Sequence, residues 1–321
     1  MNVLVVPSNR PDHLRTFLDA WQPWPWDHVV IVEDAPSPST REDDARITRL
    51  CWSDIDRDIS VAGVISRGDS AIRAFGFWHA WKIGAEVILT LDDDCYPSDD
   101  GWVARHRSNL FETPKWQSSW PGLRVRGLPY ENGGTMTNVA VSVGLWRGHP
   151  DLDAIQTLAS RPIEDRILRH GVRARVMSSD QLFPMSGMNL ACRRDAACLM
   201  YFPPMGHGSP FARFDDIWAG LVIQRICRHL RLAIVCGGPL IDHQRASDPF
   251  ANLVKEAPGI RAHEELWTAI DRVPLTAATS LAAMRQMGCA LERETGFDGY
   301  LRKWGQGIRH WCQLFDAEET A

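Results

Sequence analysis

The chain has 321 residues, of which 45% are hydrophobic and 23% are charged, and its formal net charge is −5. This length allows one large domain or two small ones with a buried core, and the composition excludes a disordered chain. The negative charge argues against a protein dedicated to binding DNA or RNA, so we expect no nucleic acid partner.

Membrane and secretion signals are the next features to consider. No run of about 18 apolar residues occurs, so the sequence predicts no membrane-spanning helix. Residues 1–7 are too short for the apolar core of a signal peptide and lack a basic leader, so they predict a first strand. The eight cysteines lack the CxxC spacing of a zinc site. We therefore expect reduced thiols in core positions of a cytoplasmic protein.

Short apolar runs and helical patterns alternate through the first hundred residues. The runs predict strands at 3–6, 29–32, 61–65 and 87–91, with helices near 15–21 and 71–83. Such alternation is typical of an α/β fold in which a mainly parallel central sheet of Rossmann type is flanked by helices on both faces.

The rest of the chain continues with a strand at 139–143, helices near 151–158 and 216–230, and a strand at 232–236. Beyond about residue 262 the pattern is helical, so we expect a main domain, 1–260, and a C-terminal helical extension, 261–321. An apolar stripe of the extension would pack on the domain or on a second subunit of a homo-oligomer. It comprises Tyr300, Leu301, Trp304, Ile308, Trp311, Cys312 and Phe315.

Three consecutive carboxylates, Asp92, Asp93 and Asp94, directly follow the strand predicted at 87–91. Charges this close repel each other, and a divalent cation such as Mn²⁺ or Mg²⁺, completed by a diphosphate, relieves the repulsion. Because alternate residues of an extended chain share a face, Asp92 and Asp94 would point towards the metal, with Asp92 and Asp93 also near the nucleotide. The alternative is an acidic turn that begins a surface helix.

Other charged side chains also follow predicted strands, where ligands bind in open α/β sheets. Asp34 could hold a ribose hydroxyl or a base N–H group, or could simply begin a loop. No GxxxxGK[ST] or GxGxxG sequence is present, so a diphosphate would be held by the metal and by scattered cations. The candidate cations are Arg10, Arg73 and Arg245.

Asp215 and Asp216 stand at the start of the helix predicted at 216–230. Helix capping explains one of the two carboxylates and leaves the other for general-base work or for a sugar hydroxyl. His243 follows a predicted strand and is a candidate metal ligand through a neutral ring nitrogen. Its alternative is a structural role, which is commoner for a lone histidine.

Several segments resemble the reversibly glycosylated polypeptide family, which includes plant UDP-arabinopyranose mutases and their microbial relatives. The resemblance is collinear from about residue 3 to residue 256. The segments that carry it are 69–77 (DSAIRAFGF), 92–95 (DDDC), 126–129 (RGLP), 182–190 (LFPMSGMNL), 201–202 (YF), 213–220 (RFDDIWAG) and 243–253 (HQRASDPFANL).

This resemblance implies a glycosyltransferase-A (GT-A) type fold, with 1–260 as the nucleotide-sugar-binding catalytic domain. The family interconverts the pyranose and furanose forms of a UDP-sugar, typically UDP-arabinose, with Mn²⁺ or Mg²⁺. Its members also glycosylate themselves reversibly on an arginine that corresponds to Arg126 here. A second family arginine has no counterpart, because Gly133 stands in its place. The preferred sugar and nucleotide base therefore stay open.

The chemistry that we expect follows from these assignments. Arg126 would capture the anomeric carbon as UDP leaves, with Asp215 or Asp216 taking the guanidinium proton, since a charged guanidinium has no free lone pair. In the alternative, Arg126 only steadies a phosphate or a carboxylate. Asn189 and the turn at 186–187 would hold sugar hydroxyls. Three functions remain open: a UDP-sugar mutase, a glycosyltransferase with a separate acceptor, and a nucleotide-sugar-binding subunit without turnover.

Overall fold

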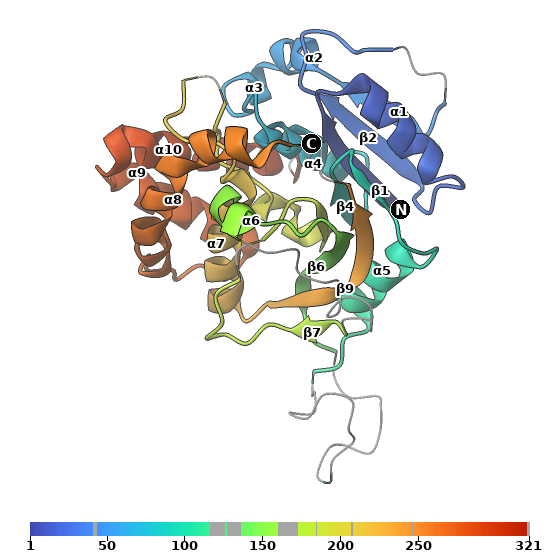
Figure 1. Cartoon of the computed structure of the whole chain (residues 1–321). Helices are drawn as coiled ribbons and strands as arrows, with labels where there is room; N and C mark the ends of the chain where they lie inside the picture. The colour runs from blue at the N-terminus through green and yellow to red at the C-terminus, as the bar shows by residue number, and fades with distance from the viewer. Residues whose placement is uncertain are drawn as a thin grey trace.

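A computed structural model of the chain describes residues 1–40, 44–115, 126, 136–159, 173–183, 185–206, 208–244 and 247–319. Within these residues, nine strands form a single sheet that has helices on both faces (Figure 1). The α/β fold predicted from the alternation of strands and helices is therefore confirmed.

The N-terminal half of the sheet is parallel, as expected, and its strands lie in the order β3-β2-β1-β4. Their bounds are β1 Asn2–Ser8, β2 His28–Glu33, β3 Ile47–Leu50 and β4 Val87–Leu91. Helices that follow the strands along the chain cover this half: α1 Pro11–Ala20, α2 Trp52–Arg57, η1 Ser70–Ile72 and α4 Arg73–Lys82. The carboxyl ends of β1, β2 and β4 consequently lie at one edge of the sheet.

Beyond β4 the sheet is mixed, so the parallel arrangement that we expected covers only part of it. Strand β8 is antiparallel to β4 and to β6, β6 is parallel to β9, and β5 and β7 are antiparallel to β9. The bounds are β5 Cys95–Pro97, β6 Val139–Gly148, β7 Arg175–Val176, β8 Asn189–Arg193 and β9 Ala233–His243. Because β6 and β9 run in the same direction as β4, their carboxyl ends lie at the same edge as those of β1 and β2.

The strand predicted at 61–65 is wrong. Residues Ile59–Ala62 form the short helix α3, and the backbone N–H of Ser60 donates to the side chain of Asp58, which caps the turn. Val61, Val64 and Ile65 enter the core from this turn, and their spacing of three and four residues is that of a helix. Strand β3 occurs earlier, at Ile47–Leu50.

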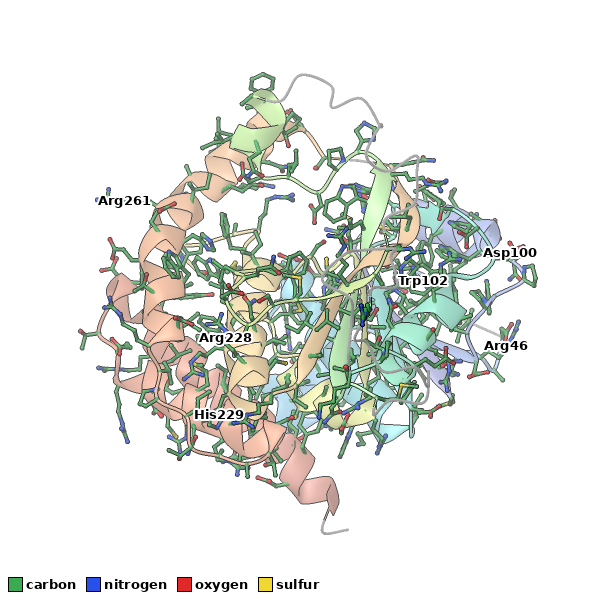
Figure 2. All side chains as sticks on the ribbon, turned by 90° about the horizontal axis from the view of Figure 1, so that it is seen from below. Arg46, Asp100, Trp102, Arg228, His229 and Arg261 are labelled. Carbon is green, nitrogen blue, oxygen red and sulfur yellow. The ribbon has the colours of Figure 1, made fainter. Side chains whose placement is uncertain are left out.

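Alternating residues of the strands fill two cores, one on each face of the sheet. In β1, Leu4 and Val6 pack with α1 and with α5, Trp102–Phe111, and Trp102 lies between α5 and the sheet (Figure 2). Val3 and Val5 pack on the opposite side with α4 and α7, Asp215–Leu230. Burial of both faces explains why these strands are mostly apolar along their whole length and do not alternate apolar with polar residues.

Three long helices form the C-terminal part of the chain. Their bounds are α8 Pro249–Asp271, α9 Ser280–Arg293 and α10 Tyr300–Glu319, and α8 also packs against α6, Ala154–Ala159. Residue 260, the expected domain boundary, lies inside α8. The apolar stripe from Tyr300 to Phe315 is buried within the chain, and Trp311 Nε1 donates to the carbonyl oxygen of Cys198 at 2.7 Å. Of the two predicted packings, the stripe adopts the one on its own domain.

The cysteines and the helices bear on two further expectations. All eight cysteines are free, six of them buried and two partly exposed. Among the helices in the described ranges, none has both the length and the apolar character needed to cross a bilayer.

Candidate active site

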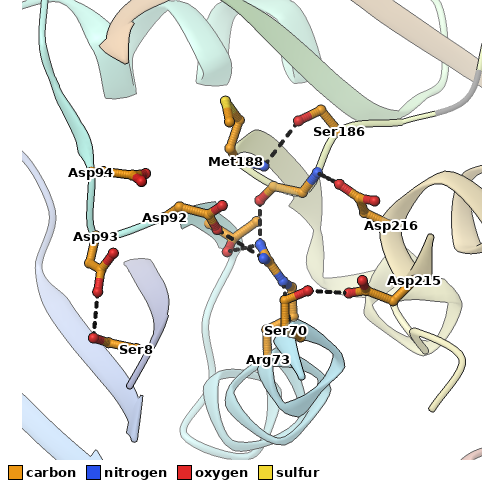
Figure 3. A network of polar contacts seen from close by, with 12 residues as sticks. Ser8, Ser70, Arg73, Asp92, Asp93, Asp94, Ser186, Met188, Asp215 and Asp216 are labelled. Atoms are coloured by element: carbon orange, nitrogen blue, oxygen red, sulfur yellow. Dashed lines mark hydrogen bonds and ion pairs between the residues drawn. The ribbon is translucent and has the colours of Figure 1, made fainter. Parts of the chain in front are cut away.

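The candidate site lies where the carboxyl ends of β1, β4, β6 and β9 meet the start of β8 and the start of α7. Each of the sequence-predicted carboxylates at this edge follows directly from a strand or opens a helix. Figure 3 shows them around one arginine, with Asp92, Asp93 and Asp94 on one side and Asp215 and Asp216 on the other. The sheet direction therefore brings together residues that are more than a hundred positions apart in the sequence.

The three consecutive aspartates form a turn between β4 and β5, and each has a different set of partners. Asp93 is buried and accepts hydrogen bonds from the Ser8 hydroxyl and from Arg10. Asp92 is the most exposed and accepts a hydrogen bond from the Arg73 guanidinium at 2.8 Å. Arg10 also reaches Asp94, at 3.2 Å. Arg10 therefore contacts the carboxylates of the turn, where we had expected it to contact a diphosphate.

Asp94 and His243 form a pair that is suited to a cation. Oδ1 of Asp94 is buried without a hydrogen-bond partner and lies 3.8 Å from Nε2 of His243. The other ring nitrogen, Nδ1, lies 2.7 Å from the carbonyl oxygen of His149. A carbonyl only accepts, so Nδ1 carries a proton, and Nε2 is the ring nitrogen that can present a lone pair to a metal ion. Two lone pairs that face each other beyond hydrogen-bond distance fit a shared divalent ion.

The electrostatic environment of Asp94 also favours a bound divalent cation. Burial and the neighbouring Asp92 charge raise the pKa of Asp94 above its ordinary value. A bound cation would offset this cost. In the portion of the chain that the structure describes, however, no three His, Cys, Asp or Glu side chains come together as a metal site. The predicted set of Asp92, Asp94 and His243 is thus not assembled: Asp94 and His243 face each other, and Asp92 bonds to Arg73.

Arg73 is the buried cation at the centre of the site. It opens α4, and its side chain is only 3% exposed. Its guanidinium donates to Asp92, to the carbonyl oxygen of Gly187 and to the carbonyl oxygen of Ser70. A Cβ at position 187 would lie 2.7 Å from a guanidinium nitrogen, so the glycine permits this close approach. Arg73 therefore joins the Asp92 turn to the segment that precedes β8.

Asp215 and Asp216 open α7 and are held by different partners. Asp215 is buried and accepts a hydrogen bond from the Ser70 hydroxyl at 2.7 Å. Asp216 accepts from the backbone N–H of Gly187 at 2.9 Å and of Ile217 at 2.8 Å. Burial, with the charges of Asp215 and of Asp151, raises the pKa of Asp216 to about 8. Burial also raises the pKa of Asp215, although Arg73 opposes the shift. A carboxyl with such a pKa can both give and take a proton near neutral pH.

Asp151 and Ser70 belong to the site but did not stand out in the sequence. Asp151 follows β6, accepts a hydrogen bond from the Ser186 hydroxyl at 2.5 Å and is close enough to Asp216 to influence its pKa. The position of Asp151 after a strand at the binding edge was the one available signal, and we had instead placed it at the start of a helix. Ser70 had no signal beyond its place in a family segment.

Asp34 lies after β2, at the side of the site nearest β3. Its Oδ1 atom accepts hydrogen bonds from Trp52 Nε1 at 2.7 Å and from the backbone N–H of Gly68 at 3.0 Å. These contacts fix the carboxylate through Oδ1, and among the described residues Oδ2 accepts no hydrogen bond. The loop-starting role that we kept as an alternative is thus compatible with a binding role.

Asn189 has a structural role, which corrects the expectation that it holds a sugar hydroxyl. It is fully buried, and its Oδ1 atom accepts from Trp102 Nε1 at 2.9 Å and lies 3.0 Å from His106 Nε2. Its Nδ2 atom donates to the carbonyl oxygens of Leu145 and Pro239. The amide therefore has no capacity left for a ligand. Asn189 is only two residues from Gly187, which contacts Asp216 in the site. However, Asn189 is the first residue of β8, and its side chain is buried in the core.

Comparison with known proteins decides the family. The family model described as reversibly glycosylated polypeptide matches residues 2–320. UDP-arabinopyranose mutase 1 of Oryza sativa subsp. japonica is 38% identical over 337 residues, covering 98% of this chain and 90% of the relative.

The chain belongs to the reversibly glycosylated polypeptide family.

A second mutase relative is similar over nearly the same length of the chain. UDP-arabinopyranose mutase 2 of Arabidopsis thaliana is 34% identical, over 98% of this chain and 91% of its own. Among solved structures, a putative nucleotide-diphospho-sugar transferase from Desulfovibrio desulfuricans G20 aligns with a TM-score of 0.38 and 9% identity, covering 82% of this chain and 97% of that one.

Of three further positions named in the sequence analysis, Arg126, Gly133 and Arg245, the structure describes only Arg126. Arg126 is an exposed residue in a turn, and among the described contacts it has no hydrogen bond or ion pair with Asp215 or Asp216. Its neighbours, 116–125 and 127–135, lie outside the described residues, and this range includes Gly133. Arg245 also lies outside them.

Proposed function

We propose that this member of the reversibly glycosylated polypeptide family is a metal-dependent UDP-sugar mutase. It would interconvert the pyranose and furanose forms of a UDP-linked pentose such as arabinose, and would glycosylate itself reversibly on Arg126. The observation that carries the proposal is the meeting of the Asp92–Asp94 turn, His243 and the Asp215–Asp216 pair at one sheet edge. What supports the choice of reaction is the near full-length similarity to proteins named UDP-arabinopyranose mutases.

The nucleotide half of the site would be formed by the ends of β1, β2 and β4. Asp34 offers a carboxylate oxygen to the nucleoside, and Arg10 provides a cation beside Asp93 and Asp94. Asp94 and His243 would hold Mn²⁺ or Mg²⁺ with the diphosphate. When bound, the metal supplies charge neutralisation for the departing diphosphate.

The sugar half of the site would be formed by the start of α7 and the residues before β8. Asp216 accepts from the backbone N–H of Gly187 and Asp151 accepts from the Ser186 hydroxyl, so both carboxylates contact the residues before β8. These groups can orient sugar hydroxyls and exchange protons with them. Arg126 would capture the anomeric carbon, and Asp215 or Asp216 would take the proton that its guanidinium must lose to act as a nucleophile.

One experiment tests the reaction. The purified chain is incubated with UDP-arabinopyranose and Mn²⁺, and the products are identified by NMR. Formation of UDP-arabinofuranose is the expected result. Free arabinose, or arabinose transferred to an added acceptor, would instead favour a glycosyltransferase, and unchanged nucleotide would favour a binding subunit.

The role of Arg126 is tested with the same assay. Arg126→Ala should lose both furanose formation and the mass increase that self-glycosylation adds to the intact chain. Furanose formation at the wild-type rate by Arg126→Ala would refute the nucleophile role. Because Gly133 replaces the second family arginine, the assay includes other UDP-, GDP- and CDP-sugars.

A further inference from the structure

Ser70 connects the surface of the site with a buried carboxylate. The residue is exposed, whereas Asp215, which accepts a hydrogen bond from its hydroxyl at 2.7 Å, is only 2% exposed. Figure 3 shows the two side chains directed at each other across the gap between η1 and α7. Ser70 is therefore an exposed residue whose hydroxyl contacts a carboxylate that is itself almost inaccessible to solvent.

The backbone around Ser70 is fixed at several points. The Asp69 side chain accepts from the backbone N–H of Ala71 and so caps η1. The carbonyl oxygen of Ser70 accepts from Arg73 Nε at 3.1 Å, and the same guanidinium donates to Asp92. A single guanidinium group therefore links the Ser70 backbone to the carboxylate turn, and together with the cap on η1 it fixes the backbone from which the Ser70 hydroxyl reaches Asp215.

Ring interconversion has a proton requirement that this arrangement can meet. When a pyranose opens and recloses as a furanose, the ring oxygen that leaves the anomeric carbon gains a proton. The hydroxyl oxygen that takes its place loses one. The reaction thus needs a group that first gives and then recovers a single proton, and no outside acid or base is consumed.

We infer that Ser70 is a further catalytic residue whose hydroxyl relays this proton between the bound sugar and Asp215. In the forward direction, protonated Asp215 donates to Ser70 Oγ, the reverse of the hydrogen bond in the structure, and gives up its proton while the Ser70 proton passes to the leaving ring oxygen. On reclosure the incoming sugar hydroxyl bonds to the anomeric carbon and gives its proton to Ser70 Oγ, and the Ser70 proton returns to Asp215. The net proton change is zero. This inference rests on the proposed mutase function.

Asp215 suits the buried end of the relay better than its neighbour. Each oxygen of Asp216 already accepts a backbone N–H group, one from Gly187 and one from Ile217, so neither is paired with a hydroxyl that could carry a proton onward. Among the side chains that the structure describes, the one that donates to Asp215 is Ser70. Burial raises the pKa of Asp215, so that it can hold a proton and release it again.

The test uses the full chain with UDP-arabinopyranose and Mn²⁺, and compares Ser70→Ala, Ser70→Thr, Asp215→Asn and the Ser70→Ala/Asp215→Asn double variant. We expect Ser70→Ala to lower kcat by about 100-fold, the usual scale of general acid–base catalysis, with UDP affinity unchanged below the Tm of the variant. Ser70→Thr keeps the hydroxyl and should recover most of the rate. The double variant should be no slower than Asp215→Asn, because both changes break the same relay.

Ser66→Ala is the matched control, since it also removes a hydroxyl that donates to a carboxylate of this segment, Asp69. It should keep kcat within about twofold. A wild-type kcat in Ser70→Ala, or losses that multiply in the double variant, would overturn the relay while the mutase function stands. A wild-type chain that makes no furanose overturns the proposed function and the relay together.

Discussion

His243 Nε2 lies 3.8 Å from Asp94 Oδ1, an oxygen that is buried without a hydrogen-bond partner. A divalent ion between them should bind the folded chain in preference to the unfolded one and so stabilise it. We therefore expect Mn²⁺ to raise the Tm of the wild type and to leave the Tm of His243→Ala unchanged. His149→Ala is the control: His149 contacts His243 through its backbone carbonyl oxygen, so the Mn²⁺ shift should persist. An equal shift in His243→Ala would place the ion elsewhere.

Asp216 gives the stability of the chain a pH dependence. The folded chain keeps the Asp216 proton up to about pH 8, whereas an unfolded chain loses it near pH 4. Between these values the folded state binds more protons, so this group makes stability fall as pH rises, until the effect levels off above pH 8. Asp216→Asn removes the titration. We therefore expect the Tm of Asp216→Asn minus the Tm of the wild type, both measured without metal, to increase as the pH is raised from 4 to 8. Parallel Tm curves would show that Asp216 titrates as an ordinary carboxyl.

Arg73 offers a test of the charge balance within the site. Its buried guanidinium faces Asp92, Asp215 and Asp216, so its removal leaves carboxylates without their counter-charge. We expect Arg73→Met to lower the free energy of unfolding by about 3–5 kcal/mol. Arg285→Met breaks an exposed ion pair with Asp316 and should cost less than about 1 kcal/mol. Urea denaturation measures the free energy of unfolding of both variants. Equal decreases in the two variants would show that Arg73 contributes no more to stability than an exposed ion pair does.

Asn189 separates a structural role from a binding role. Asn189→Ala leaves two buried donors and two carbonyl oxygens without their partner, so we expect a loss of at least about 3 kcal/mol in the free energy of unfolding. At temperatures where Asn189→Ala is still folded, its KM for the UDP-sugar should equal that of the wild type. A raised KM with little loss of stability would restore the sugar-binding role that the sequence suggested.

Local patterns predicted the elements well where both faces of a strand or one face of a helix are buried. The apolar run at 87–91 coincides with β4, and the helix predicted at 216–230 is α7 with one residue added. The run at 61–65 misled because Val61, Val64 and Ile65 fit a short strand and a helical turn equally well. Strand direction was not predictable, since β8 is buried much as its neighbour β4 is, although the two strands run antiparallel.

The candidate site was predicted where charge follows a strand or opens a helix, as at Asp92–Asp94 and Asp215–Asp216. The contacts that define its chemistry join residues far apart in the sequence, such as Ser70 with Asp215 and Arg73 with Gly187. Those contacts depend on how α4, α7 and β8 pack, and no local pattern encodes that packing. Asn189 shows the reverse case, because a residue beside the site turned out to serve the core.

Calorimetric titration of UDP into the wild-type chain and into Asp94→Asn, with and without Mn²⁺, tests the central claim most directly. The account predicts that Mn²⁺ tightens UDP binding to the wild type by at least about tenfold, or about 1.4 kcal/mol, and has no such effect on Asp94→Asn. UDP binding that is the same with and without Mn²⁺ in the wild type, or a Mn²⁺ effect that survives in Asp94→Asn, would contradict a metal-assisted nucleotide-sugar site at this edge of the sheet.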